Sequence, residues 1–111
     1  MRDDTVYLRH IMERIRHIKE NIAAGRDRFM ASYTLQDAVL RNLQTMTESV
    51  QRLSEALKAT RPEVEWKRII SSRNVLVHNY LGVDLQRIWE IIQRDVPELK
   101  RAISSMLNKK L

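Results

Sequence analysis

The chain has 111 residues, of which 43% are hydrophobic and 31% charged, a balance typical of one folded domain. It contains no cysteine, which excludes disulfides, thiolate metal ligands and thiol nucleophiles. Its 20 Lys and Arg outnumber its 14 Asp and Glu, and the net charge of +6 favours a polyanionic partner such as RNA without identifying one.

The first element in chain order is an amphipathic helix. Because the chain has only two glycines and two prolines, it has few turn formers, which favours long helices over short strands. Apolar residues at steps of three and four over 8–22 predict a helix whose N-cap lies within residues 3–5. Gly25 stands just beyond the stripe and is expected to end this helix.

A second apolar stripe over 35–57 predicts the longest helix, unbroken for more than six turns. Thr34 and Asp37 resemble a capping box at its start, with Asp in place of the preferred Glu or Gln. Arg61 and Pro62 are expected to end it, since proline cannot continue a helix.

The third helix is expected to begin at Glu63 or Trp66 and to run to Asn79. A fourth stripe over 85–106 follows Asp84, a plausible N-cap. Pro97 lies inside this stripe, so a kink or a split into two helices is expected near Asp95. The fold class predicted for residues 1–111 is therefore a single all-α domain, an up-and-down bundle of four main helices.

The third helix breaks its own apolar pattern at Arg73. The stripe of Trp66, Ile70, Val77 and Tyr80 lacks one member, and the guanidinium of Arg73 occupies that position. A charge facing a core costs several kcal/mol unless it is paired or opens onto a wet cleft. Two alternatives follow: a structural arginine bonded to a buried acid, with Glu48 as the candidate, or a functional cation.

His78 adds an ionisable group five residues after Arg73. Five residues on an ideal helix correspond to a rotation of about 140°, so the two side chains of one chain point to different sides. Asn74 shares the histidine's side, and Tyr80 returns to the arginine's side. Either the helix ends or bulges near Asn79, or two copies of the helix face each other across one cleft, which requires a dimer.

The series Arg73, four residues, His78, one residue, Tyr80 resembles the R-x4-H-x-Y signature of HepT-like toxins in the HEPN family. The surrounding string is RNVLVHNYLGVD. The segments AVLRNLQTMTESVQRL, PEVEWKRII and LQRIWEIIQRDVPELK resemble the family's second helix, the lead into its third, and its fourth, so the likeness covers most of the chain. The chain departs from the family pattern at four positions, Thr47, Ser49, Ser71 and Ser72.

The resemblance implies a HEPN-like homodimer that cleaves RNA, often tRNA or mRNA, without a metal ion or other cofactor. His78 would then move protons, and Arg73 would neutralise the charge that builds on the phosphorane. Asn74 would orient His78 or bind the phosphate, and Glu48 would be a supporting acid. The alternative is a non-catalytic HEPN dimer that binds RNA or docks to a nucleotidyltransferase.

The resemblance also implies control through Tyr80. HepT-like toxins are inactivated by a minimal nucleotidyltransferase antitoxin that attaches AMP to this tyrosine, and a bulky anion on a basic cleft would repel RNA. The alternative is that Tyr80 only closes the helix against Leu81 and Trp66.

No metal site, membrane association or export is expected. His10 and His17 lie seven residues apart without a third ligand nearby, so a metal site is not predicted. The N-terminal MRDDTVYLRH lacks the apolar core of a signal peptide, and no apolar run is long enough to span a membrane. We therefore expect a cytoplasmic protein.

Overall fold

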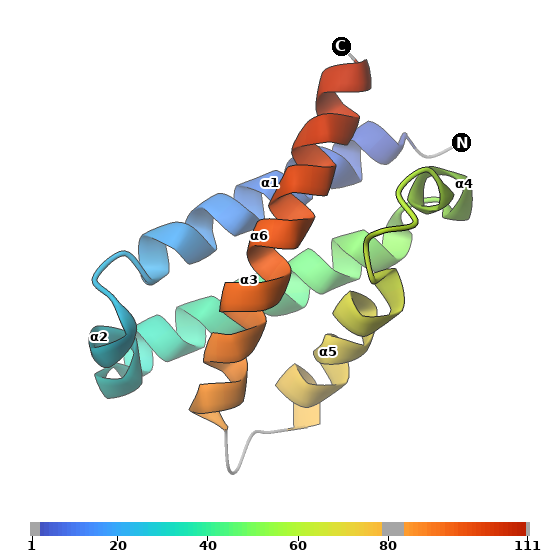
Figure 1. The fold of residues 1–111 in the computed structure, drawn as a ribbon. Coiled ribbons are helices and arrows are strands. Elements are labelled where there is room, and N and C mark those ends of the chain that lie inside the picture. The colour runs from blue at the N-terminus through green and yellow to red at the C-terminus, as the bar shows by residue number, and fades with distance from the viewer. Residues whose placement is uncertain (1–2, 79–83, 111) are drawn as a thin grey trace.

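The structure is a computed structural model that describes the backbone of residues 3–78 and 84–110 and the side chains of 3–74 and 84–108. Within these ranges the chain forms six helices and no strand (Figure 1): α1 (Asp4–Asn21), α2 (Arg26–Ala31), α3 (Tyr33–Arg52), α4 (Glu55–Ala59), α5 (Trp66–His78) and α6 (Leu85–Lys110). The all-α prediction is confirmed, and the four longer helices correspond to the four that the sequence indicates. The two short helices, α2 and α4, were not predicted.

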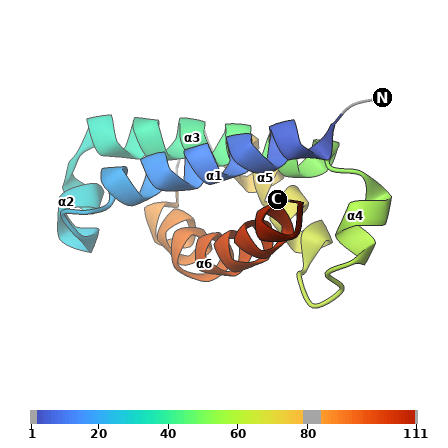
Figure 2. The same ribbon diagram turned by 90° about the horizontal axis from the view of Figure 1, so that it is seen from above.

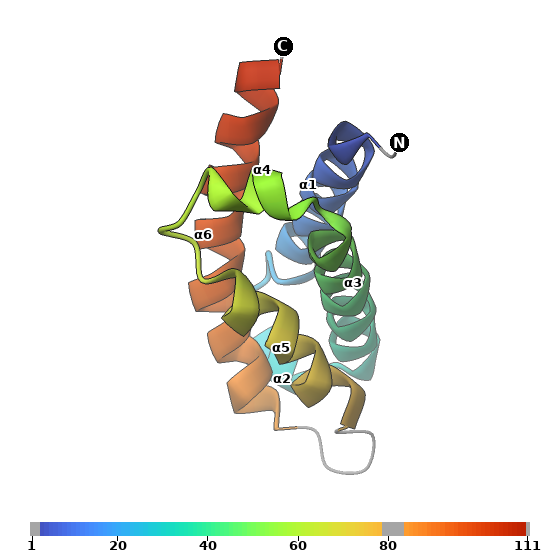
Figure 3. The same ribbon diagram turned by 90° about the vertical axis from the view of Figure 1, so that its right-hand side faces the viewer.

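The longer helices pack in two layers. α1 and α3 run side by side, and α6 crosses this pair on one side (Figures 1 and 2). α5 packs against α3 and also contacts α6 (Figure 3). α5, the helix that carries the sequence motif, is therefore anchored from two directions.

Three of the predicted stripes face the core. α1 buries Leu8, Ile11, Ile15 and Ile18, α3 buries Val39, Leu43, Met46 and Val50, and α6 buries Ile88, Ile92, Val96, Leu99, Ile103 and Met106. Burial of a large apolar side chain stabilises the fold by about 1.5–3 kcal/mol, so these residues hold the layers together. In the described part of the chain, no helix combines the length and hydropathy needed to cross a bilayer.

Helix ends follow the predicted caps in two of three cases. Asp3 accepts a hydrogen bond from the Thr5 amide of α1 at 2.9 Å, and Asp84 accepts one from the Arg87 amide of α6 at 3.1 Å. The predicted cap of the second long helix, Thr34, is wrong: Ser32 is the N-cap and accepts from the amide of residue 35. Thr34 lies inside the first turn instead.

The predicted end of the first helix also shifts. α1 stops at Asn21, with Ile22 as its C-cap. Gly25 does have a positive φ, 96°, but it stands at the N-terminus of α2 instead of closing α1. Its backbone conformation, which other residues rarely adopt, turns the chain into the short helix.

The predicted extent of the second long helix is wrong as well. α3 ends at Arg52, and Leu53, although buried, has an extended backbone. Ser54 then caps α4 and binds Asp4 of α1 twice, with its amide 2.9 Å from Oδ1 and its hydroxyl 2.7 Å from Oδ2. This local capping and the tie to α1 outweigh the apolar periodicity that continues to Leu57.

Pro97 does not divide the last helix. α6 is continuous from Leu85 to Lys110 with Pro97 inside it, so of the two expected outcomes, a kink or a split, the split does not occur. The proline removes one backbone hydrogen bond, but Val96 and Leu99 on its two sides are buried in the core. Tertiary packing on both sides of the proline therefore keeps the helix in one piece.

Candidate functional site

The motif-bearing helix α5 is anchored by a face other than the one the sequence indicated. Ile69 is fully buried, and Ser72 is buried with its hydroxyl donating to the Ile69 carbonyl at 2.6 Å. Trp66 and Ile70 are only half-buried, and Arg73 is exposed. The premise that Arg73 faces the core is therefore wrong, because the stripe to which it belongs flanks the buried face.

Glu48 of α3 is the partner of Arg73 in the single chain. Their charged atoms, Arg73 Nη2 and Glu48 Oε1, are 3.7 Å apart, and the side chains are 44% and 48% exposed. The contact with Glu48, one of the two alternatives for Arg73, is thus observed, but the burial expected with it is not. A long, half-exposed ion pair contributes about 0–1 kcal/mol to the free energy of unfolding. Glu48 therefore positions the guanidinium but leaves it accessible to a ligand.

Thr47 and Ser49 explain why Glu48 is exposed. Both are buried: the Thr47 hydroxyl donates to the Gln44 carbonyl, and Ser49 Oγ lies 2.5 Å from Nδ1 of His10 on α1. Ser49 therefore joins α3 to α1 and Thr47 is buried within the fold, while the intervening carboxylate of Glu48 faces Arg73 of α5. His10, which the sequence analysis treated only as one of a histidine pair, joins this contact.

The remaining motif residues are described only in part. Asn74 is exposed beside Arg73. α5 stays helical through its last residue, His78, so positions 73 and 78 keep a separation of about 140° around the helix. The side chain of His78 and the whole of Tyr80 lie outside the described residues, as do Asn79 and Gly82.

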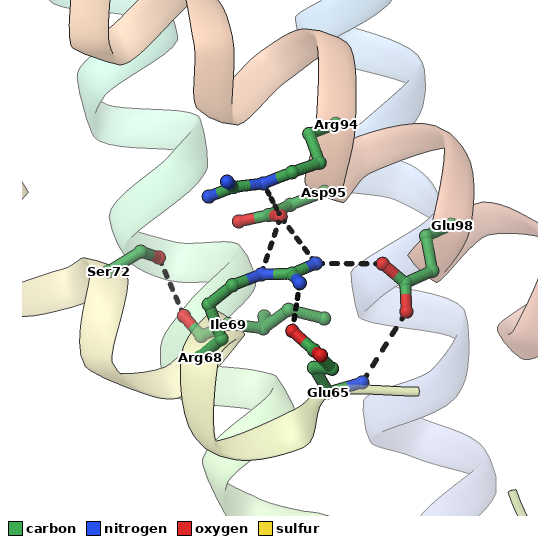
Figure 4. Close-up of polar contacts among 7 residues, drawn as sticks. All are labelled: Glu65, Arg68, Ile69, Ser72, Arg94, Asp95 and Glu98. Atoms are coloured by element: carbon green, nitrogen blue, oxygen red, sulfur yellow. Dashed lines mark hydrogen bonds and ion pairs between the residues drawn. The ribbon is translucent and has the colours of Figure 1, made fainter. Parts of the chain in front are cut away.

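A second charged cluster, which the sequence analysis missed, links α5 to α6 (Figure 4). Arg68 donates to Asp95 Oδ1 from Nε at 3.2 Å and from Nη2 at 2.9 Å, to Glu98 at 2.8 Å, and to Glu65. The side chain of Asp95 is 1% exposed, and Arg94 also contacts its Oδ1. Burial opposes the charge of Arg68, but these carboxylates raise its pKa above the ordinary value.

Two hollows border α5. One of about 730 Å³ is lined by Trp66 and Ile70 together with Pro62 and Val64. The other, about 240 Å³, lies between α5 and α6 and is lined by residues that include Ser71 and Ser72. Within the described residues, no group of three His, Cys, Asp or Glu side chains could hold a metal ion.

The comparison with protein families matches residues 9–106 to the model described as Ribonuclease HepT-like. The chain belongs to this family. The match includes all of α5 and extends over 73–80, so the HepT-like resemblance drawn from the motif is confirmed for the chain as a whole.

Curated relatives agree with the HepT-like assignment. A protein of Methanocaldococcus jannaschii named "Gamma-glutamylcyclotransferase and putative RNase" is 33% identical over 97% of this chain but 49% of its own length. A "Putative RNase" of Caldanaerobacter subterraneus subsp. tengcongensis is 30% identical over 98% of both chains. No solved structure matches this HepT-like chain significantly. The family and these names support a ribonuclease-like protein.

Proposed function

We propose that the chain is a metal-independent endoribonuclease and the toxin of a toxin–antitoxin pair. The observation that supports this most is Arg73: it lies within the HepT-like match, it is exposed, and its one described ion pair is long and half-exposed. Such an arginine can exchange Glu48 for a phosphate, because a planar guanidinium binds two phosphate oxygens at once.

The reaction proposed is transfer of the phosphate onto the substrate's own 2′-hydroxyl. As that oxygen attacks phosphorus, the P–O5′ bond breaks, which leaves a 2′,3′-cyclic phosphate and a free 5′-hydroxyl. His78 takes the 2′ proton or returns a proton to the leaving oxygen, since imidazole titrates near neutral pH. Arg73 stabilises the charge on the phosphorane, and Asn74 binds the phosphate or orients His78.

The site is proposed to be composite, with Arg73 of one copy working beside His78 of another. Helix geometry supports this, because the two positions of one α5 point to different sides. The half-buried Trp66 and Ile70, which line a hollow beside α5, offer apolar surface that a second copy could cover. The homodimer is thus part of the proposal.

Control is proposed to act through Tyr80. A cognate minimal nucleotidyltransferase would attach AMP to its hydroxyl, and the added phosphate would compete with RNA for Arg73. Glu48 would hold Arg73 in the resting enzyme, since an acid beside the guanidinium limits its motion without burying it.

The test of the proposed reaction uses unmodified RNA in EDTA. We expect the purified chain to cut tRNA or mRNA with the chelator present and to leave 2′,3′-cyclic phosphate ends, detected by mass spectrometry of the products. An RNA with 2′-O-methyl groups is the matched control and should stay intact, because it lacks the nucleophile. The mechanism would be contradicted if the methylated RNA were cut, or if unmodified RNA were cut without EDTA but not with it.

The second candidate is a non-catalytic dimer that binds RNA or docks to a nucleotidyltransferase. The Arg73–Glu48 ion pair favours it, because it gives Arg73 a role within the single chain. This candidate predicts RNA or protein binding with no cleavage under the conditions above.

A further inference from the structure

A groove between α1 and α6 has a wholly basic set of charged side chains. It has a volume of about 740 Å³ and is lined by Lys19 of α1 and by Lys100, Arg101 and Ser104 of α6, among others, with no carboxylate. Each of the other hollows described on the chain includes at least one Asp or Glu. No acidic side chain that lines this groove therefore offsets its positive charge.

Core packing places the two lysines together. Lys19 follows Ile18 in α1, and Lys100 follows Leu99 in α6; both of these apolar residues are fully buried, and α1 packs against α6. The lysines consequently emerge side by side at the edge of the contact, and the Lys100 ammonium lowers the pKa of Lys19 below its ordinary value. Like charges held together by the fold favour an anion between them.

The carboxylates adjacent in sequence are engaged elsewhere. Glu20, next to Lys19, binds Arg16 at 2.6 Å, and Glu98, two residues before Lys100, binds Arg68 at 2.8 Å. In the described part of the chain, no salt bridge involves Lys19, Lys100 or Arg101. The groove is thus left without internal counter-charge.

Arg61 extends the positive surface. Its Nη2 donates to Ser105 Oγ at 2.8 Å, and Ser105 lines the groove together with Ser104 and Asn108. Hydroxyl and amide groups of this kind hydrogen-bond phosphate oxygens, while the arginine and lysines supply charge. These basic and polar side chains suit a chain of phosphate groups better than they suit an apolar partner.

We infer that this groove binds the phosphodiester backbone of single-stranded RNA, at a place separate from the cleavage motif. The identity of the polyanion rests on the proposed function. The groove is built from α1 and α6, whereas Arg73 lies on α5 and pairs with α3, so the two contact different stretches of one strand. The groove contributes affinity without base preference, because it contacts the backbone alone.

The test is the salt dependence of binding to a 2′-O-methylated single-stranded RNA, which cannot be cleaved. Fluorescence anisotropy across a salt series compares Lys19→Gln/Lys100→Gln with Arg28→Gln/Arg41→Gln, which changes the net charge equally at exposed positions outside the groove. We expect the groove variant to bind about tenfold or more weakly at 0.1 M salt and to lower the log–log slope by about 1.4, at roughly 0.7 per phosphate contact. The control should stay within about twofold.

Two further measurements make the result decisive. Lys19→Arg/Lys100→Arg keeps both charges and should retain the wild-type slope, and the melting temperature of the glutamine variant should not fall, because a like-charge contact is removed. The inference is overturned if the groove and control variants lose RNA affinity equally, or if neither loses it. It is also overturned if the glutamine substitutions in the groove leave RNA affinity unchanged but abolish binding to an acidic protein tested in parallel. Failure of the proposed function shows separately, as wild-type chain that leaves unmodified RNA uncut.

Discussion

Arg68→Met is expected to lower the free energy of unfolding by about 3 kcal/mol, which corresponds to a fall of about 10 °C in melting temperature for a chain of this size. The cause is Asp95, which is 1% exposed and takes two of its hydrogen bonds from Arg68. Without that guanidinium, the buried carboxylate loses its main hydrogen-bond partner, and the tie between α5 and α6 is lost.

The matched control for Arg68 is Arg94→Met. Arg94 contacts the same carboxylate oxygen at 3.2 Å, but its side chain is 60% exposed, so its loss should cost about 1 kcal/mol or less. The double variant Arg68→Met/Asp95→Leu should recover part of the stability, because it removes the buried carboxylate together with its partly exposed partner. Thermal denaturation checks all three, and equal effects of the two arginines would contradict this account of the cluster.

Arg73→Ala is expected to reduce RNA cleavage by about 10²–10³-fold, the loss typical when one donor to a developing oxyanion is removed. Its free energy of unfolding should change by less than about 1 kcal/mol, because the ion pair with Glu48 is half-exposed. Single-turnover cleavage rates and thermal melts of the same preparation measure the two effects.

The control for Arg73 is Arg52→Ala, which removes an exposed positive charge from the last turn of α3. It should change the cleavage rate by only a fewfold, since Arg52 lies outside the motif and lines neither of the hollows beside α5. A sharp fall in melting temperature for Arg73→Ala with little change in rate would assign Arg73 to structure and favour the non-catalytic dimer.

Much of the fold could be predicted from the sequence because apolar periodicity reports the buried face of long helices. The stripes beginning at Leu8 and Leu85 predicted α1 and α6, and their position placed the first cap within residues 3–5 and the last at Asp84. Apolar periodicity does not report a helix end that tertiary contacts set: Ser54, which binds Asp4, follows the end of α3, although the stripe continues beyond it.

The candidate site was predicted in part. The pairing of Arg73 with Glu48 was anticipated, but its exposure was not, because Trp66 and Ile70 looked like core residues while Ile69 is the buried one. Asp95 interrupts an apolar segment of α6 just as Arg73 interrupts that of α5, and the same signal was overlooked there. An apolar pattern alone marks a charged residue within a stripe, but it does not tell whether that side chain is buried, as in Asp95, or exposed, as in Arg73.

In the proposed composite site, Arg73 of one copy acts with His78 of another. Mixing two inactive variants tests this proposal most directly. Arg73→Ala and His78→Ala chains, each assayed alone in EDTA, should cut RNA at about a hundredth of the wild-type rate or less. After unfolding and refolding together, half of the dimers contain both kinds of chain and one intact composite site each, so about a quarter of wild-type cleavage should return. A mixture that stays inactive, or a His78→Ala chain that cuts RNA by itself, would contradict the claim.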